Sequence, residues 1–246
     1  MNAAEAMTTP PREKHYIITG GTGGLGAAVV GRLIEAGATC HVPWVNESEL
    51  EHFPYASKVR LEEVDVTDAA AAEAYFQSLP ALHGSIHLVG GFDMAPIEDT
   101  TPEAFEKMWR LNTLSCFVCC RAAIAAFRRT TAARQGDRPG GVAGRIVNVG
   151  ARPAVQPTGG MTAYAVAKAG VTSLTQSLAA EVKDEGILVN AVLPSIMDTP
   201  GNRRAMPDAD FDAWPKTEQV AEAIAWLIGP ANQLTSGVLL PVYGQM

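Results

Sequence analysis

A glycine-rich turn near the start of the chain constrains the fold more than any other feature of the sequence. A short β-rich run over residues 15–19 leads into Gly20, and four more glycines follow by position 26. A helix pattern covers residues 27–36 and is closed by Gly37. A strand, a glycine turn and a helix in this order bring free backbone N–H groups and the positive end of a helix dipole to one point. That point suits a pyrophosphate group.

The spacing of the glycines limits which kinds of phosphate-binding site the turn can form. Gly20, Gly24 and Gly26 depart from the Gly-x-Gly-x-x-Gly spacing, and the turn lacks Gly-Lys-Ser/Thr, which argues against a triphosphatase P-loop. The alternative is a tight turn that binds nothing. For a bound dinucleotide we expect contacts from Gly20, Thr22, Gly24, Leu25 and Gly26.

The rest of the chain alternates strand patterns with helix patterns. This alternation predicts the α/β class, with a doubly wound parallel β-sheet of the Rossmann type and helices on both faces. We expect a single domain over residues 15–246 and a flexible N-terminal tail over residues 1–14, because no repeat or long linker divides the chain. The expected strands cover residues 40–45, 59–64, 85–89, 145–149, 188–193 and 238–242, and the expected helices cover residues 69–79, 102–129, 162–183 and 218–228.

Charge and hydropathy limit the class of partner. The formal net charge is -7 and no basic run occurs, which argues against nucleic acid and anionic lipid. We find no apolar stretch that approaches the length of a membrane span, and residues 1–14 lack the apolar region of a secretory signal. We therefore expect a cytoplasmic protein with a small-molecule substrate.

The cysteines and histidines give no metal signal in the linear sequence. Cys116-x-x-Cys119 has the spacing of a redox or metal pair, but no second Cys or His pair stands near it. We interpret Cys40, Cys116, Cys119 and Cys120 as small buried side chains in a reduced compartment. The five histidines show no metal-ligand spacing, so we expect no metal site.

The residues at the end of the second strand bind the adenosine end of a dinucleotide and distinguish NAD(H) from NADP(H). An acidic residue there binds a ribose 2'-hydroxyl, and an arginine accepts a 2'-phosphate. Trp44, Val45 and Asn46 supply neither, so we favour NAD(H) over NADP(H) on the absence of a cation. Asp65, after the third strand, either hydrogen-bonds the adenine or caps the helix that starts near Asp68.

Residues 195–215 follow the C-terminal end of a strand, where open α/β sheets place their ligands. The segment carries apolar and aromatic side chains, Met197 and Trp214 among them. We interpret it as a substrate lid and expect these two side chains to contact the substrate.

Tyr164 and Lys168 are four residues apart in a helix pattern, so they lie on one face. A nearby ammonium favours the phenolate form of a tyrosine, and each unit of pKa lowering takes about 1.4 kcal/mol. Lowering the pKa of Tyr164 from about 10 towards 7 takes roughly 4 kcal/mol, which Lys168 and an oxidised nicotinamide would share. The pair predicts a general acid and base at neutral pH.

Several motifs occur in a fixed order and together resemble the short-chain dehydrogenase/reductase family over nearly the whole chain. The resemblance implies that Tyr164 donates the proton, that Lys168 binds the nicotinamide ribose, and that Asn112 positions a water in a proton relay. It also implies cofactor contacts from Asp65, Val66, Gly90, Gly91, Pro194, Ile196 and Thr199. The motifs are the glycine turn, Asp65-Val66, Asn112, Tyr164-Ala-Val-Ala-Lys168, Asn190-Ala-Val-Leu-Pro194 with Thr199, and Ser236-Gly-Val-Leu-Leu-Pro-Val242.

Three positions depart from the family pattern. Leu88-Val89-Gly90-Gly91 stands in place of Asn-Asn-Ala-Gly, and Pro194-Ser195 in place of Pro-Gly. The third departure matters more, because Ala151 occupies the position of the catalytic serine and removes the usual second donor to a substrate oxygen. Losing one such donor typically costs about a hundred- to a thousandfold in rate.

The alanine leaves two interpretations of the substrate. Either Thr158 or Thr162 replaces the serine, or the substrate needs only one donor, as a conjugated imine-like ring would. Ala151 and residues 195–215 also resemble the dihydropteridine reductase branch of the family, whose pattern has alanine for the serine, whereas Asn112 follows the general family. We expect Ala151 and Thr158 beside the substrate.

These observations predict an NAD(P)-dependent oxidoreductase that transfers hydride to a small conjugated substrate such as a quinonoid dihydropteridine. The alternatives are a carbonyl or alcohol oxidoreductase with a threonine in place of the serine, and a dinucleotide-binding sensor or partner subunit without turnover. The apolar faces of the helices over residues 102–129 and 162–183, with the family resemblance, predict a homodimer or homotetramer.

Overall fold

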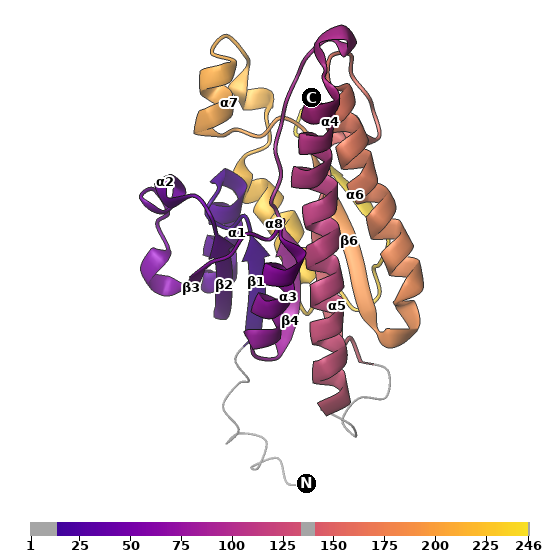
Figure 1. Ribbon diagram of the computed structural model, residues 1–246. Helices are drawn as coiled ribbons and strands as arrows, with labels where there is room; N and C mark the ends of the chain where they lie inside the picture. The colour runs from indigo at the N-terminus through magenta and orange to yellow at the C-terminus, as the bar shows by residue number, and fades with distance from the viewer. Residues whose placement is uncertain (1–13, 134–140, 246) are drawn as a thin grey trace.

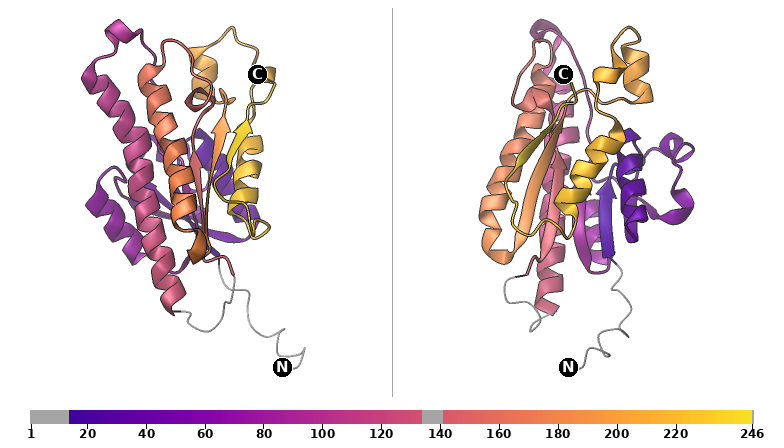
Figure 2. Two further views of the ribbon diagram at one scale, coloured as in Figure 1. Left: turned by 90° about the vertical axis from the view of Figure 1, so that its right-hand side faces the viewer. Right: turned by 180° about the vertical axis from the view of Figure 1, so that it is seen from behind.

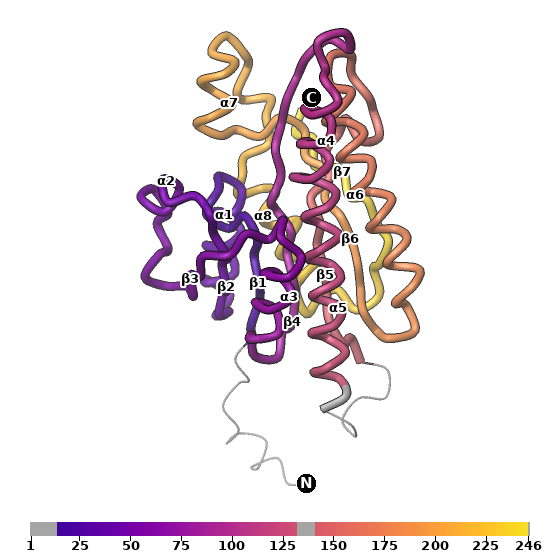
Figure 3. The backbone as a smooth tube through the Cα atoms, in the orientation of Figure 1, coloured from indigo at the N-terminus to yellow at the C-terminus, as the bar shows by residue number. Residues whose placement is uncertain are grey.

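One parallel sheet of seven strands organises the residues that the computed structural model describes, 14–133 and 141–245 (Figure 1). The strand order is β3-β2-β1-β4-β5-β6-β7, and the labels follow this order across the tube drawing in Figure 3. The predicted tail lies outside the described residues except for Lys14. The strands are β1 (Lys14–Thr19), β2 (Ala38–Trp44), β3 (Arg60–Glu63), β4 (Leu82–His87), β5 (Gly144–Val149), β6 (Ile187–Pro194) and β7 (Leu239–Val242).

The strand order confirms the predicted doubly wound α/β class. From β1 the chain builds the sheet outwards through β2 to β3, and it then returns to the other side of β1 with β4. The direction of winding therefore reverses between β1 and β4, and ligands of open parallel sheets bind outside the C-terminal ends of the strands at such a point.

Helices cover both faces of the sheet, as predicted. Figures 1 and 2 show α1 and α8 on one face and α3, α5 and α6 on the other. The helices are α1 (Gly24–Glu35), α2 (Glu47–Leu50), α3 (Ala69–Ser78), α4 (Pro102–Trp109), α5 (Ser115–Ala133), α6 (Thr162–Glu181), α7 (Pro200–Ala205) and α8 (Thr217–Ile228).

Alternating side chains along the strands fill two cores. On β1, Ile17 packs into the core under α3, α5 and α6, whereas its neighbour Ile18 packs into the core under α1 and α8. Ile146 and Val147 divide in the same way on β5. Successive side chains of a strand point to opposite faces, so a strand buried on both faces needs an uninterrupted apolar run.

The fourth strand begins three residues earlier and ends two residues earlier than predicted, at Leu82 and His87. The start was missed because His83 and Gly84 are not typical strand residues. A Cβ at Gly84 would lie 2.7 Å from Ile228 Cγ1 and 2.8 Å from Tyr16 Cδ1. The glycine is therefore required by close packing between β4, α8 and β1.

The predicted continuous helix over residues 102–129 contains a π-helical turn. Arg110–Leu114 forms that turn between α4 and α5, and such turns are frequent at functional sites. The helical stretch Pro102–Thr131 is long and apolar enough to cross a bilayer, contrary to our expectation that no such stretch exists. Its most apolar window is 61% buried inside the molecule, so packing against the sheet accounts for its composition.

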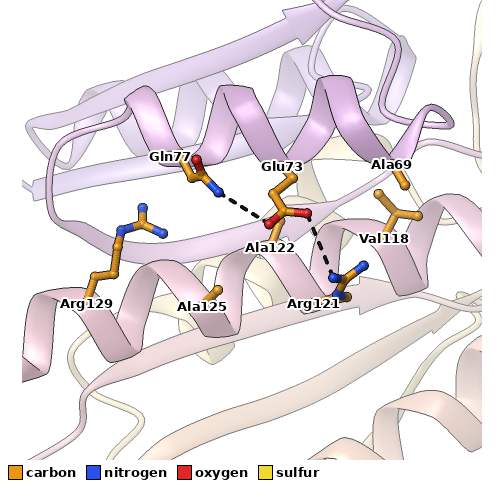
Figure 4. A pocket seen from close by; sticks show the side chains of 8 residues that line it. All are labelled: Ala69, Glu73, Gln77, Val118, Arg121, Ala122, Ala125 and Arg129. Atoms are coloured by element: carbon orange, nitrogen blue, oxygen red, sulfur yellow. Dashed lines mark hydrogen bonds and ion pairs between the residues drawn. The ribbon is translucent and has the colours of Figure 1, made fainter.

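A small cavity of about 110 Å³ lies between α3 and α5 (Figure 4). Glu73 crosses it and contacts Gln77 and Arg121. None of the predicted site residues lines this cavity. All four cysteines are buried and unpaired, which confirms their interpretation as small buried side chains.

Candidate functional site

The predicted site residues follow four neighbouring strands at one edge of the sheet. The glycine turn follows β1, Gly90 follows β4, Ala151 follows β5, and Ile196 follows β6. In a parallel sheet the C-terminal ends of all strands lie on the same edge. The topology therefore gathers residues that are far apart in the sequence.

The glycine turn is held by contacts that exclude side chains. Gly20 has a φ of 70°, and a Cβ on it would lie 2.9 Å from the backbone nitrogen of Val89. A Cβ on Gly26 would lie 2.1 Å from the carbonyl oxygen of Gly20. Glycine is required at both positions, since one needs a left-handed backbone and both need close backbone approach.

The helix that follows the turn presents free donors. α1 begins at Gly24, and its N-cap residue Gly23 makes no side-chain capping bond. The first N–H groups of a helix lack partners within the helix and lie at the positive end of its dipole. The turn and α1 therefore form a cradle that fits a pyrophosphate.

A carboxylate that sequence reasoning missed lies beside this turn. The hydroxyl of Thr22 donates a hydrogen bond to Glu49, which comes from α2 after the end of β2. Asn46, considered at this position, instead accepts hydrogen bonds from the backbone and the hydroxyl of Ser48 and caps α2. An acidic group from beyond the end of β2 thus contacts the glycine turn, and it belongs to Glu49.

Asp65 does not cap the helix after β3. Its carboxylate accepts hydrogen bonds from the backbone N–H of Thr67 at 2.8 Å and from the hydroxyl of Thr67 at 2.7 Å. Asp68 caps α3 itself by accepting from Ala70 and Ala71. The capping interpretation of Asp65 is therefore wrong, its contact with the adenine stays a prediction, and Val66 beside it is buried.

Lys168 is buried within the site. Lys168 is only 6% exposed, and its Nζ donates a hydrogen bond to the carbonyl oxygen of Val149 at 2.9 Å. Burial disfavours the charged ammonium and lowers the pKa of Lys168 to about 8. A buried amine tied to the end of β5 is a fixed donor whose charge titrates near neutral pH.

Asn112 brings an unsatisfied acceptor to the same place. It lies in the π-helical turn, and its Nδ2 donates to the carbonyl oxygens of Met108 at 2.9 Å and Gly91 at 3.1 Å. Its Oδ1 is buried and has no hydrogen-bond partner among residues 14–133 and 141–245. A Cβ on Gly90 would lie 2.6 Å from this oxygen and 3.2 Å from Nζ of Lys168. Asn112 Oδ1 and Lys168 Nζ therefore lie on either side of one position, and the buried oxygen can accept a hydrogen bond from a donor placed there.

Tyr164 is protonated in the protein alone. Burial raises its pKa to about 12, although Nζ of Lys168 lies 5.9 Å from the centre of its ring. Desolvation of the phenolate is the cause of this rise, and the lowering that we expect from Lys168 together with an oxidised nicotinamide stays a prediction. Phe92 packs edge-on against Tyr164, with ring centres 5.0 Å apart.

Position 151, where the resemblance led us to expect a serine hydroxyl, is enclosed by neighbouring residues. Ala151 is buried at the start of a short 3-10 turn, Arg152–Ala154. The preceding Gly150 has no space for a side chain, since its Cβ would lie 2.4 Å from Leu193 Cδ2. Thr158 and Thr162, the two hydroxyls considered as substitutes, are both exposed to solvent.

The segment predicted as a lid is ordered by a short helix, α7, which stands above the sheet edge in Figure 1. Asp198 at its base pairs with Arg203 at 2.5 Å and with Lys216 at 2.6 Å, and these cations hold the pKa of its carboxyl well below the usual range. Thr199 caps α7, and a Cβ on Gly24 would lie 3.4 Å from its Cγ2. The lid therefore begins directly beside the first turn of α1.

The side chains of the lid are already packed. Trp214 is buried, and its ring centre lies 5.0 Å from that of Phe211 in a tilted contact. The guanidinium of Arg203 lies 4.6 Å from the centre of the Phe211 ring. Met197 packs at the margin of the core under α1 and α8. Contact between these two side chains and the substrate stays a prediction.

The whole arrangement fits a nicotinamide dinucleotide. The cradle at the glycine turn accepts the pyrophosphate, and the unsatisfied Oδ1 of Asn112 and the buried amine of Lys168 offer polar partners at the other end. Pro194 ends β6 and Thr199 caps α7 beside Gly24, and the cofactor contacts expected from Pro194, Ile196 and Thr199 stay predictions.

Comparisons with known proteins agree with this geometry. The family profile described as short chain dehydrogenase matches residues 14–210. A galactitol 2-dehydrogenase from Rhizobium johnstonii is 32% identical over 92% of each chain. A 4-formylbenzenesulfonate dehydrogenase from Comamonas testosteroni is 29% identical over 93% of this chain and 95% of its own.

Solved structures match as well. A short chain oxidoreductase from Pseudomonas aeruginosa, described as NADPH-bound and as containing an atypical catalytic center, has a TM-score of 0.80 and 25% identity. The match covers 95% of this chain and 98% of that one.

The close approach of Gly26 to the carbonyl oxygen of Gly20 predicts that a side chain at position 26 strongly destabilises the protein. We expect Gly26→Ala to lower the free energy of unfolding by about 3 kcal/mol, because the added methyl group would overlap the carbonyl oxygen of Gly20. Gly23→Ala is the matched control, since its nearest contact is 3.5 Å away, and we expect a loss within about 1 kcal/mol. Urea unfolding followed by circular dichroism measures both, and equal losses would contradict the described turn.

Proposed function

The chain belongs to the short-chain dehydrogenase/reductase family and is an NAD(P)-dependent oxidoreductase, and from that premise we propose that it reduces a small conjugated substrate. The observation that carries the proposal is Ala151, which is buried at the position of the missing hydroxyl donor. Tyr164 is then the one hydroxyl at the centre of the site. A substrate whose own ring spreads the incoming charge needs only that donor.

Tyr164, Lys168 and Asn112 have different roles in the proposed reduction. The bound dinucleotide supplies the hydride. Tyr164 donates the proton, and its raised pKa keeps the phenol protonated at neutral pH until it does so. In its charged form Lys168 stabilises the phenolate that is left, and the carbonyl oxygen of Val149 fixes its amine. Asn112 Oδ1, which lacks a partner among the described residues, would accept a hydrogen bond from a water beside that amine, and this water would relay a proton towards the phenol.

The surroundings of Tyr164 favour a flat substrate. Phe92 contacts the tyrosine ring and is 61% exposed, so one aromatic side chain is available beside the proton donor. Aromatic rings bury planar ligands well by offset or edge-to-face contacts. A quinonoid dihydropteridine, which is planar, conjugated and rich in nitrogen, has both properties that Ala151 and Phe92 select for.

A second candidate is the reduction of an ordinary carbonyl or the oxidation of an alcohol. The names of the related galactitol and 4-formylbenzenesulfonate dehydrogenases favour it. This function needs a hydroxyl in place of the serine, from Thr158 or Thr162. Both are exposed, so substrate binding would have to bring one of them to the reacting oxygen.

A substrate panel separates the two candidates. We expect the wild-type protein to oxidise reduced nicotinamide with quinonoid dihydropteridine at least a hundredfold faster than with simple ketones, because one donor suffices only for the conjugated ring. Tyr164→Phe should lose at least a hundredfold of that rate, since the proton donor is removed. Initial rates of absorbance loss measure both quantities.

Two matched variants complete the panel. Thr158→Ala and Thr162→Ala should leave the rate with the conjugated substrate unchanged, since neither hydroxyl takes part. If ketones are the better substrates and one of these variants slows their reduction, the second candidate is correct instead.

For the cofactor we propose NAD(H) over NADP(H), and Glu49 supports this preference. Its carboxylate bonds to Thr22 at the glycine turn and follows the end of β2, where a ribose 2'-phosphate would be read. A negative charge at this place repels a phosphate and accepts a hydrogen bond from a hydroxyl. The proposed preference for NAD(H) therefore comes from Glu49, which lies beyond the end of β2.

Removal of the Glu49 charge should weaken this preference. We expect Glu49→Gln to lower the ratio of NADH to NADPH affinity by about tenfold, the effect of one repulsive pair in a partly solvated site. Glu47→Gln on the same short helix is the control and should leave the ratio within about twofold. Fluorescence titrations with both dinucleotides measure the ratio, and a wild-type preference for NADPH would contradict the assignment.

A further inference from the structure

Three soft or borderline metal ligands meet in the core beneath the proposed site. His87 ends β4, and Cys116 and Cys120 stand one turn apart on α5. The ligand atoms of all three lie within 4.8 Å of one another, and all three residues are buried. Sequence spacing did not indicate this group, because the histidine comes from a different element and the relevant cysteine partner is at i+4, not in the Cys-x-x-Cys pair.

The distance between Cys120 and His87 is that of two ligands in a tetrahedral zinc site. Zinc binds sulfur at about 2.3 Å and histidine nitrogen at about 2.0–2.1 Å, which places sulfur and nitrogen ligands roughly 3.5 Å apart across a tetrahedral angle. Cys120 Sγ lies 3.5 Å from His87 Nδ1. A fourth ligand atom is nearby, since Asn148 Oδ1 lies 2.8 Å from the same nitrogen and 3.4 Å from the same sulfur.

The surrounding hydrogen bonds orient these ligands. Ser85 Oγ lies 2.7 Å from His87 Nε2, the ring nitrogen that faces away from the cysteines. Metal-bound histidines commonly use their second ring nitrogen in this way. Asn148 Nδ2 donates to Thr175 Oγ1 at 3.0 Å, which turns its carbonyl oxygen towards the group.

We propose that His87, Cys116 and Cys120, with Asn148 as fourth ligand, form a binding site for a zinc-like divalent cation. On binding, the two thiols lose their protons to solvent, so two thiolates balance the charge of the cation. His87 stays neutral, with its proton on Nε2 donated to Ser85 Oγ and Nδ1 on the metal. The buried site carries no net charge when filled, which limits the cost of burial.

The group lies between α5 and strands β4 and β5. Cys116 is close enough to Lys168 for their charges to interact, but the proposed reduction assigns no role to the histidine or the two cysteines. Cadmium is a suitable probe, because it takes the same tetrahedral thiolate and imidazole ligands as zinc and gives an ultraviolet charge-transfer band with bound thiolates.

Titration of the reduced wild-type protein with cadmium chloride tests the proposal. Overnight equilibration at each point allows for the burial of the ligands. We expect one equivalent to bind, with a thiolate-to-cadmium band. Cys116→Ser and Cys120→Ser should each weaken binding at least tenfold and reduce the band. Cys119→Ser is the matched control, because Cys119 is equally buried on the same helix but outside the group, and it should bind like the wild type.

The wild-type titration keeps the test decisive if a serine variant misfolds, as circular dichroism would reveal. A wild-type protein without a charge-transfer band overturns the proposal. Unchanged binding in both folded variants, or equal loss in Cys119→Ser, also overturns it and leaves the group as a hydrogen-bonded network of the core.

Discussion

The close approach of the glycine turn to the end of β4 is the contact on which the rest of the structure depends. Gly20 packs against the backbone of Leu88 and Val89, and Gly26 packs against the turn itself. These contacts set α1 at the point where the winding of the sheet reverses. A side chain at either glycine would push the helix away from the strand ends, and the phosphate cradle would be lost.

The other end of the site depends on buried polar groups that the scaffold fixes. Lys168 is tied to the end of β5 through Val149, and Asn112 is held by two carbonyl oxygens in a π-helical turn. Burial of the amine lowers its pKa, and burial of Tyr164 raises the pKa of the phenol. The free protein therefore holds Tyr164 in its protonated, acid form.

Local patterns predicted the class of fold, the glycine turn and the helix that carries Tyr164 and Lys168, because each depends on residues close together in the sequence. The features that were missed depend on contacts between distant elements. Gly84 is a strand residue only because α8 packs on it. Glu49 is a site residue only because α2 folds back onto the turn, and the π-helical turn at Asn112 has no pattern of its own. The burial of Tyr164, which raises the pKa of its phenol in the free protein, could not be predicted from spacing.

Binding of NADH tests most directly the claim that the turn and the buried lysine serve one ligand. Titration followed by nicotinamide fluorescence should give one site per chain in the wild type. Lys168→Met should weaken binding at least tenfold, the loss of one buried charged donor. Lys183→Met, at an exposed position after the same helix, should bind like the wild type. A wild-type protein that does not bind NADH, or equal affinities in all three proteins, would contradict the account.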